Sequence, residues 1–488
     1  MSPDNGLQEQ LVPDQRAVSD KATCPEAADG AIALNGCGRK TEGQDGGWPA
    51  YRVLLAVTVI SAVPLGIILS YGVFNAHYQD IYSSADDAVW IGVVSNGITF
   101  LLMPPLIYVY TTVCRRQPLI HFVWIGWLVT GISLLGAAFS TTINALVVTQ
   151  GLLLGLGVLL CESPMLQILN TWFVSKRGLA YGIYWGAGDT LAVGISFLAD
   201  YLLGSLGTRP TFLIFCGFRL PAAPPPVTVA RCSVAFFKHP LFYLLLSASL
   251  FHALCFYIPQ IYLSTFAIEI LALPAYSRPL LTALQNVAAI VGQLSFGWLS
   301  DITSLHILVI TSSGTCAVAA ITLWGCTSLT GTPSSQLAIL CIFAIVFGVL
   351  SSGMMSLWAR MGLCFSSSQQ QAGPDDIVDH TQPEDEQHNN KHSVPATSQV
   401  NSDCSQLVFG WLNASRGLGI LVSGPLSKAL LNGHQDRPVS TNSATFGAGR
   451  HWQRVVIFVA CMMAASAIAG LAAWAIDRRE RRGRPRKR

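Results

Sequence analysis

Long apolar blocks separated by short polar segments make up most of this 488-residue chain. A block of about 20 predominantly apolar residues can cross a bilayer as a helix, whereas a soluble protein breaks its apolar residues into short periodic pieces. We therefore predict an all-α membrane protein with twelve transmembrane helices in two six-helix bundles. The predicted helices cover residues 50–74, 88–110, 118–140, 142–165, 179–204, 210–230, 240–263, 279–300, 305–328, 336–360, 405–430 and 454–476.

The sixth block is the weakest of the twelve. Its apolar stretch TFLIFCGF is followed at once by Arg219 and the proline-rich run LPAAPPP. About ten apolar residues are too few to span a bilayer as a simple helix. Three interpretations remain open: a truncated spanning helix, a span that runs through the prolines to about Val229, or a deletion in the gene model or in splicing.

The polar segments define the expected domains. Within the second bundle, the segment 364–404 is rich in Gln, Asp, Glu, His and Ser and is expected to be a disordered cytosolic loop. The whole division is a disordered cytosolic tail at 1–47, an N-terminal six-helix bundle at 48–218, a cytosolic inter-bundle loop at 219–239, a C-terminal six-helix bundle at 240–476 and a basic cytosolic tail at 477–488.

Basic residues predict the orientation, because Lys and Arg are enriched in cytosolic loops. Arg115 and Arg116, Lys176 and Arg177, and the eight basic residues of the C-terminal tail would all lie on one face. Two arginines, at positions 437 and 450, fall on the opposite face and count against this orientation. The balance places both termini in the cytosol, which requires an even number of helices. We expect a multi-pass protein of the plasma membrane, with a vacuolar or other organelle membrane as the alternative.

Composition supports a membrane protein and offers no enzyme site. The chain is 51% hydrophobic and 11% charged, against about 25% charged residues in soluble proteins. Its net charge of +3 suggests no nucleic-acid partner. The HExxH, GxSxG and GxxxxGK[ST] motifs are absent, and the thirteen cysteines form no CxxC pair. We predict no enzymatic activity, no cofactor and no metal, and we make no prediction of oligomeric state.

Two charged residues fall in the middle of predicted spans, where a charge is costly and marks a candidate functional site. At about 1.5 Å per residue, Asp189 and Arg416 each lie about 16 Å into a hydrocarbon core about 30 Å thick. Arginine stays charged and its planar fork fits a carboxylate. We predict that Arg416 binds an anionic substrate and that Asp189 contributes to substrate binding or proton coupling. The alternatives are a structural ion pair for Arg416 and helix packing for Asp189.

Other polar residues are weaker candidates. Glu162, near the cytosolic end of its span, is a candidate for proton coupling or for a gating ion pair with Lys176 or Arg177; a simple salt bridge is the alternative. His121 and His252 are expected to be packing residues. Two further histidines, at 388 and 392, are four apart in a polar segment where no helix is expected to align them.

Two motifs resemble the major facilitator superfamily and, within it, the fungal-type branch of the monocarboxylate-porter family. DGGW (Asp45–Trp48) precedes the first span, and WFVSKRGLAYGIYWGAG (Trp172–Gly188) enters the fifth. GWLSD (Gly297–Asp301) is similar to the superfamily's loop motif without its trailing arginine. The resemblance covers residues 45–476 and implies transport by alternating access between two bundles.

The chain also departs from mammalian members of that family. Those members carry a lysine in the first helix and an Asp/Arg pair in the eighth, where this chain has Leu69 and Ser70, and Gln285, Asn286 and Gln293. Asn286 is retained as a candidate substrate-binding residue.

We therefore expect a secondary active transporter of small organic anions, monocarboxylate-like, or of a related metabolite. The alternatives are an exporter of a secondary metabolite and a non-transporting membrane sensor or decayed paralogue.

Overall fold

The computed structural model describes residues 45–81, 88–113, 118–217, 235–274, 276–362, 365, 396–431, 446–448 and 450–483. Within these residues the chain is helical, and no strand occurs. The predicted disordered tail is thus described only from residue 45, and most of the loop 364–404 lies outside the described part. The basic pair at 115 and 116 and the histidines at 388 and 392 also lie outside it.

The first half of the chain forms a run of antiparallel helices. Several contain or begin at proline, which is accepted at the first helical positions because it has no N–H to satisfy there. The elements are α1 (Trp48–Leu69), α2 (Tyr71–Ile81), α3 (Val89–Leu101), α4 (Met103–Tyr108), η2 (Val109–Val113), α5 (Ile120–Phe139), α6 (Ile143–Leu146), η3 (Val147–Leu153), α7 (Leu154–Trp172), α8 (Arg177–Leu206) and α9 (Thr208–Cys216).

The second half repeats this pattern. Its helices α10 and α13 begin at Pro240 and Pro333. The elements are η4 (Ala235–Lys238), α10 (Pro240–Thr265), η5 (Phe266–Ile270), α11 (Ser277–Ile302), α12 (Leu305–Ala319), η6 (Ala320–Gly325), η7 (Thr327–Leu329), α13 (Pro333–Met361), α15 (Ala396–Leu431), η9 (Phe446–Ala448) and α16 (Arg450–Gly483).

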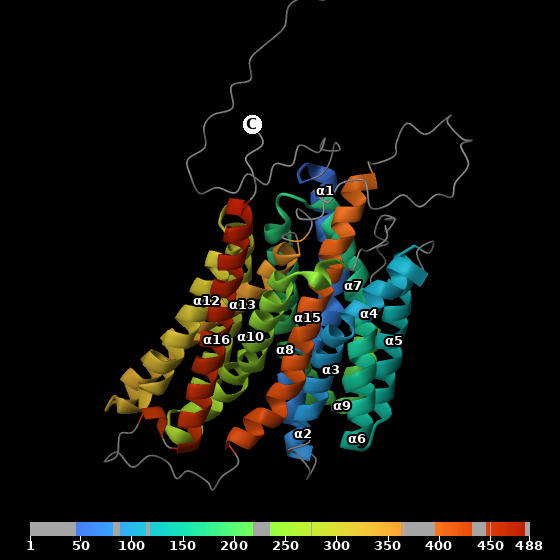
Figure 1. Ribbon diagram of the computed structural model, residues 1–488. Helices are drawn as coiled ribbons and strands as arrows, with labels where there is room; N and C mark the ends of the chain where they lie inside the picture. The colour runs from blue at the N-terminus through green and yellow to red at the C-terminus, as the bar shows by residue number, and fades with distance from the viewer. Residues whose placement is uncertain are drawn as a thin grey trace, which may run out of the picture.

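The helices gather into two groups. Figure 1 shows α10, α12, α13 and α16 on one side and α3, α4, α5 and α7 on the other, with α8 and α15 between them. The groups meet where α8 packs on α11 and where α15 packs on α3 and α4. α1 begins and α16 ends at the same end of the molecule, as an even number of crossings requires (Figure 1).

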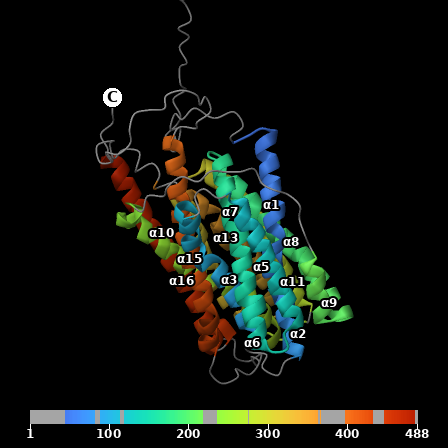
Figure 2. The ribbon, with the colours of Figure 1, turned by 90° about the vertical axis from the view of Figure 1, so that its right-hand side faces the viewer.

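Ten stretches of the described chain are long and apolar enough to cross a membrane. Two predicted spans are not among them. α9 has only nine residues and packs against α5 and α8, at the edge of the molecule in Figure 2. α15 has 36 residues, but polar side chains along its middle lower its hydropathy.

Three predicted boundaries differ in the structure. α15 begins at Ala396, so the last part of the segment 364–404 is helical rather than loop. α16 continues to Gly483, so the basic tail begins as helix, in which Arg, Glu and Lys have good propensity. Asp45, expected in a disordered tail, is 8% exposed and hydrogen-bonded.

Candidate functional site

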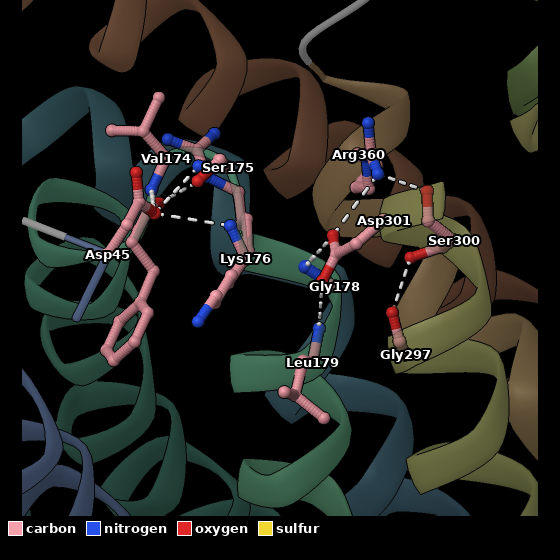
Figure 3. A network of polar contacts seen from close by, with 12 residues as sticks. Asp45, Val174, Ser175, Lys176, Gly178, Leu179, Gly297, Ser300, Asp301 and Arg360 are labelled. Atoms are coloured by element: carbon pink, nitrogen blue, oxygen red, sulfur yellow. Dashed lines mark hydrogen bonds and ion pairs between the residues drawn. The ribbon is translucent and has the colours of Figure 1, made fainter. Parts of the chain in front are cut away.

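One end of the molecule is held by a polar network around the turn between α7 and α8. Asp45 lies on one side of this turn and Asp301 on the other (Figure 3). The predicted orientation places this network at the cytosolic face. The two motifs that carry the family resemblance, Asp45–Trp48 and Trp172–Gly188, meet here.

Asp45 binds the turn through backbone N–H groups and through the side chain of Ser175. Its Oδ1 accepts hydrogen bonds from the backbone N–H groups of Val174, Ser175 and Lys176 at 2.7, 2.7 and 3.2 Å. Its own N–H donates to the carbonyl of Trp172 at 3.1 Å. Successive N–H groups of this kind form a concave site for an anion. Burial raises the pKa of Asp45, but the backbone hydrogen bonds outweigh burial and hold the pKa below its ordinary value.

Asp301, at the end of α11, joins the two helix groups. Its Oδ1 and Oδ2 accept the N–H groups of Gly178 and Leu179, each at 2.9 Å, at the N-terminus of α8. A helix N-terminus carries partial positive charge and unsatisfied N–H groups, so a carboxylate is stabilised there. Arg360, at the end of α13, forms an ion pair with Asp301 at 3.2 Å and also donates to the carbonyl of Ser300.

Arg177 adds a second connection at the same end. It is 2% exposed, and its Nε, Nη2 and Nη1 donate to the carbonyl of Phe173 at 3.1 Å, the carbonyl of Asn170 at 3.0 Å and the hydroxyl of Ser405 on α15 at 3.2 Å. Asn170 also donates to the side chain of Gln406 on α15. The predicted ion pair between Glu162 and Arg177 or Lys176 is therefore wrong for this conformation, because Arg177 is fully engaged elsewhere and Lys176 is exposed.

Glycines let α8 and α11 approach closely beside this network. A Cβ added to Gly182 would lie 2.5 Å from the carbonyl oxygen of Gln293, and one added to Gly297 would lie 2.6 Å from that of Gly178. Side chains at these positions would force the helices apart. This end of the molecule, which is predicted to face the cytosol, is therefore closed by close backbone packing as well as by polar contacts.

Arg416 lies deeper, among aromatic rings from three helices. Its guanidinium carbon is 4.3 Å from the ring centre of Phe100 on α3, 5.2 Å from Trp358 on α13, and 5.7 and 5.9 Å from Phe256 and Tyr257 on α10. Such rings attract a cation through their negative faces. Phe100 belongs to the first half of the chain and Arg416 to the second, so this site lies between the two groups.

The guanidinium of Arg416 has unused hydrogen-bonding capacity. Its Nη2 donates to the hydroxyl of Tyr257 at 2.9 Å, and the side chain is 3% exposed. Its Nη1 has no hydrogen-bond partner among the described residues. A buried charged donor without a partner is costly, which makes this nitrogen a candidate contact for an anionic ligand.

The two predicted acids lie in different environments. Asp189 is half-buried on α8, and its Oδ2 accepts a hydrogen bond from Gln293 of α11 at 2.8 Å. Glu162 on α7 is 1% exposed, and neither of its carboxyl oxygens has a hydrogen-bond partner among the described residues. Arg416 acts electrostatically on both acids. No direct ion pair joins Arg416 to either acid in the described chain.

The remaining candidates make no hydrogen bond to Arg416 within the described residues. Asn286 is exposed on α11, next to the buried Gln285. His121 is exposed at the start of α5. His252 is 2% exposed, and its ring centre lies 5.5 Å from that of Phe256.

Sequence reasoning missed several residues of these sites. The aromatic partners of Arg416 come from three separate helices, and nothing in the order of residues signals that they meet. Arg177 was interpreted as a topology signal, and a buried role for it could have been suspected from the resemblance of Trp172–Gly188 to a family motif.

No protein-family model matches the chain. The chain is 27% identical over 352 residues to the Fujikurins efflux protein of Gibberella fujikuroi, covering 68% of this chain and 73% of that protein. It is 24% identical to the MFS transporter asaE of Aspergillus flavus, covering 64% and 72%. It is also 24% identical to monocarboxylate transporter 11 of Mus musculus, covering 53% and 60%.

Two solved structures share the fold. A bacterial homologue of the iron transporter ferroportin in an outward-facing state matches with a TM-score of 0.54 and 14% identity, over 87% of this chain and all of that one. The proton:xylose symporter XylE matches with a TM-score of 0.58 and 11% identity, over 88% and 96%.

The helical architecture and the ten spanning stretches define a multi-pass membrane protein with the fold of a transporter. The predicted resemblance to the major facilitator superfamily is confirmed, and the relatives within it include monocarboxylate transporters and fungal efflux proteins.

Proposed function

We propose that this protein is a secondary active transporter that carries a small organic anion, monocarboxylate-like, across the membrane by alternating access. The observation that carries this proposal is Arg416, a buried cation between the two helix groups with one guanidinium nitrogen that has no partner among the residues that the structure describes. In superfamily transporters of this architecture, substrate sites lie near the bilayer midplane at the interface between repeats.

The surroundings of Arg416 support a negatively charged substrate. Phe100, Trp358 and Phe256 shield the guanidinium from water, so an entering carboxylate would meet a cation in a low-dielectric environment. Asp189 and Asn286 are the further proposed substrate contacts, and each lies on a helix of the α8–α11 pair.

The closed cytosolic end supports alternating access. Asp301 and Arg177 each join the two helix groups there through bonds that must break for the cytosolic side to open. We propose that these contacts form and break during the transport cycle.

Export of a metabolite is the second candidate, and the extent of the alignments favours it. The two fungal relatives align over 64–68% of this chain, whereas mouse monocarboxylate transporter 11 aligns over 53%. The fungal relative with the highest identity of these is named as an efflux protein. An anionic metabolite would use the same Arg416.

Counterflow of labelled lactate, pyruvate and benzoate into proteoliposomes tests the proposal. The wild-type protein should accumulate at least one of these anions, and Arg416→Ala should accumulate it at least about tenfold more slowly. Arg416→Lys is the matched control, since it keeps the charge but loses the planar fork. Equal counterflow in wild type and Arg416→Ala, or none with any organic anion, would refute it. Faster uptake into inside-out than into right-side-out vesicles would support export.

A further inference from the structure

Two buried tryptophans near Arg416 have indole N–H groups without an acceptor. Trp185 on α8 is 3% exposed, and Trp358 on α13 is 0% exposed. In the described part of the chain, no atom accepts a hydrogen bond from Nε1 of either residue. A buried tryptophan N–H usually has a partner, and leaving it unpaired costs free energy. The two donors therefore call for an acceptor that the described residues do not supply.

Both tryptophans belong to the surroundings of Arg416. The ring centre of Trp358 lies 5.2 Å from the guanidinium carbon of Arg416. Phe100 connects Trp185 to the same group, because its ring centre lies 4.3 Å from that carbon and 6.1 Å from the ring centre of Trp185. α8 comes from the first half of the chain and α13 from the second, and the two helices are in contact. The unpaired donors thus come from both halves, as the proposed substrate site does.

Trp324 on η6 shows that an unpaired indole alone does not define a site. Its Nε1 also has no partner among the described residues, and its side chain is 0% exposed. It packs in a different apolar cluster, however, with the ring centres of Phe266 and Phe343 at 6.1 and 5.5 Å. Trp185 and Trp358 share one cluster with Phe100. What distinguishes these two donors is their place beside Arg416, and Trp324 is their matched control.

The chemistry of these donors defines the ligand that would satisfy them. Nη1 of Arg416 is charged and suits a carboxylate. An indole N–H is a neutral donor that does not offset a second buried negative charge, so it suits a neutral oxygen such as that of a carbonyl, ether or ester. The rings of Phe100, Phe256 and Trp358 lie beside the guanidinium, and aromatic faces of this kind stack on another planar ring.

We infer that Trp185 and Trp358 determine substrate specificity by donating hydrogen bonds to neutral oxygen atoms of the substrate. The substrate class is then an oxygenated aromatic carboxylate, whose carboxylate binds Arg416 and whose further oxygen binds an indole N–H. This inference rests on the proposed binding of an anion by Arg416. A carboxylate without a further oxygen leaves both indoles unpaired when it binds. A site built to hydrogen-bond a group discriminates strongly against an analogue that lacks the group, for that reason.

Competition between shape-matched anions tests the inference on the full-length protein in proteoliposomes. In 4-isopropenylbenzoate a CH2 group replaces the carbonyl oxygen of 4-acetylbenzoate, and the 3-substituted acids form a second such pair. In at least one pair, the acetyl acid should inhibit counterflow of labelled benzoate about tenfold more strongly in wild type. The double variant Trp185→Phe, Trp358→Phe keeps aromatic rings but lacks both N–H groups, so it should lose this preference, whereas Trp324→Phe should retain it. Equal inhibition within both pairs in wild type, or a preference retained in the double variant, would overturn the inference.

Nuclear magnetic resonance of the protein labelled with nitrogen-15 at its indole nitrogens gives a readout that needs no transport. The three single Trp→Phe variants assign the N–H resonances of Trp185, Trp358 and Trp324. An acetylbenzoate should shift the resonance of Trp185 or Trp358 and leave that of Trp324 in place, and its isopropenyl counterpart should shift none of them.

This readout separates the inference from the proposed function. Shifted resonances without transport of any anion would refute the proposed function and support the inference. Unshifted resonances, or equal shifts with both acids of each pair, would refute the inference whether or not an anion is transported. If the double variant fails to fold, the wild-type competition and these shifts decide.

Discussion

Two regions of the molecule differ in how many partners their buried charged groups have. One is the end around the α7–α8 turn, which is predicted to face the cytosol, and the other is the region around Arg416. At the cytosolic end, Asp45, Asp301 and Arg177 each have a full set of partners. By contrast, the guanidinium of Arg416 and the carboxyl group of Glu162 have polar atoms with no hydrogen-bond partner in the described part of the chain. The two regions lie on the same helices: α8 runs from the network toward Asp189, and α15 runs from Ser405 to Arg416.

This difference fits two different roles, one in stabilising a conformation and one in binding a ligand. A network whose partners are all in place stabilises one conformation, and it must be broken as a unit for that conformation to change. A site with unused donors and acceptors is completed by something outside the chain, such as a ligand or a proton. The cytosolic network thus fits a gate, and the Arg416 region fits a binding site.

The largest effect is expected from Arg416→Ala. A hydrogen bond to a charged group contributes about 1.5–3 kcal/mol, so its loss should weaken anion transport about tenfold to a hundredfold. Initial uptake rates at equal reconstituted amounts measure it, and Arg416→Lys should recover only part of the loss. Wild-type kinetics in Arg416→Ala would mean that Arg416 is a structural charge, like Asp45, Asp301 and Arg177, and the proposed difference between the two regions would be wrong.

A smaller effect is expected from Asp301→Asn at the gate. Losing the charge weakens the bonds to the α8 N-terminus and the ion pair with Arg360, for a cost to the closed state of about 2 kcal/mol. Residues between α8 and α11 should then react faster with a cytosolic thiol reagent, read from single-cysteine reporters. Asp200→Asn, an exposed acid on α8, is the control and should change nothing. Equal reactivity in the two variants would argue against a gate.

Gly182→Ala should loosen the same interface by packing rather than by charge. Its new Cβ would meet the Gln293 carbonyl at 2.5 Å. Overpacking costs about 1–3 kcal/mol, and the gain of about 1 kcal/mol from replacing glycine in a helix offsets part of it. Gly194→Ala on the same helix meets nothing within 4 Å and should be neutral or stabilising. Thermal unfolding of the two variants compares them, and a Gly182→Ala protein as stable as Gly194→Ala would show that the interface is not closely packed.

The smallest effect is expected from Asp45→Asn, and it should depend on pH. Because the pKa of Asp45 is held below its ordinary value, its charge stabilises the fold fully above about pH 4 and progressively less as the pH falls through the lowered pKa. Wild type should exceed Asp45→Asn by about 1 kcal/mol near neutral pH, as for a capping carboxylate, and the gap should close in acid. Unfolding midpoints at both pH values test this, and a constant gap would mean that the contribution of Asp45 is not electrostatic.

Sequence alone predicted the helices well because their signal is local. The start of α8 near residue 177 and the starts of α10 and α12 follow from apolar length and position. The sequence left the length of the sixth span open; α9 ends at Cys216, and residues 218–234, through which a longer span would run, lie outside the described part of the chain.

What sequence did not predict depends on contacts between distant segments. Asp45 is 129 residues from Val174, and Asp301 is 123 residues from Gly178. Gln293 was noted only as an uncharged residue of the eighth span, yet it is the residue that binds Asp189. The sequence predicted the burial of Arg416, whereas the burial of Asp45 and Arg177 and the partners of each charge are seen only in the structure.

The polar middle of α15 also bears on how the protein is made. An arginine at the centre of a helix costs about 2.5–3.5 kcal/mol on insertion into the bilayer, and α15 is not among the ten stretches apolar enough to cross by composition. It packs on α3 and α10, which are synthesised earlier and offer the aromatic rings that surround Arg416. We therefore expect the insertion of α15 to depend on helices that are already in the membrane. The ribosome synthesises α3 and α10 first, and α15 then inserts against them. Substitutions that remove Phe100 would then reduce the amount of mature protein as well as its activity.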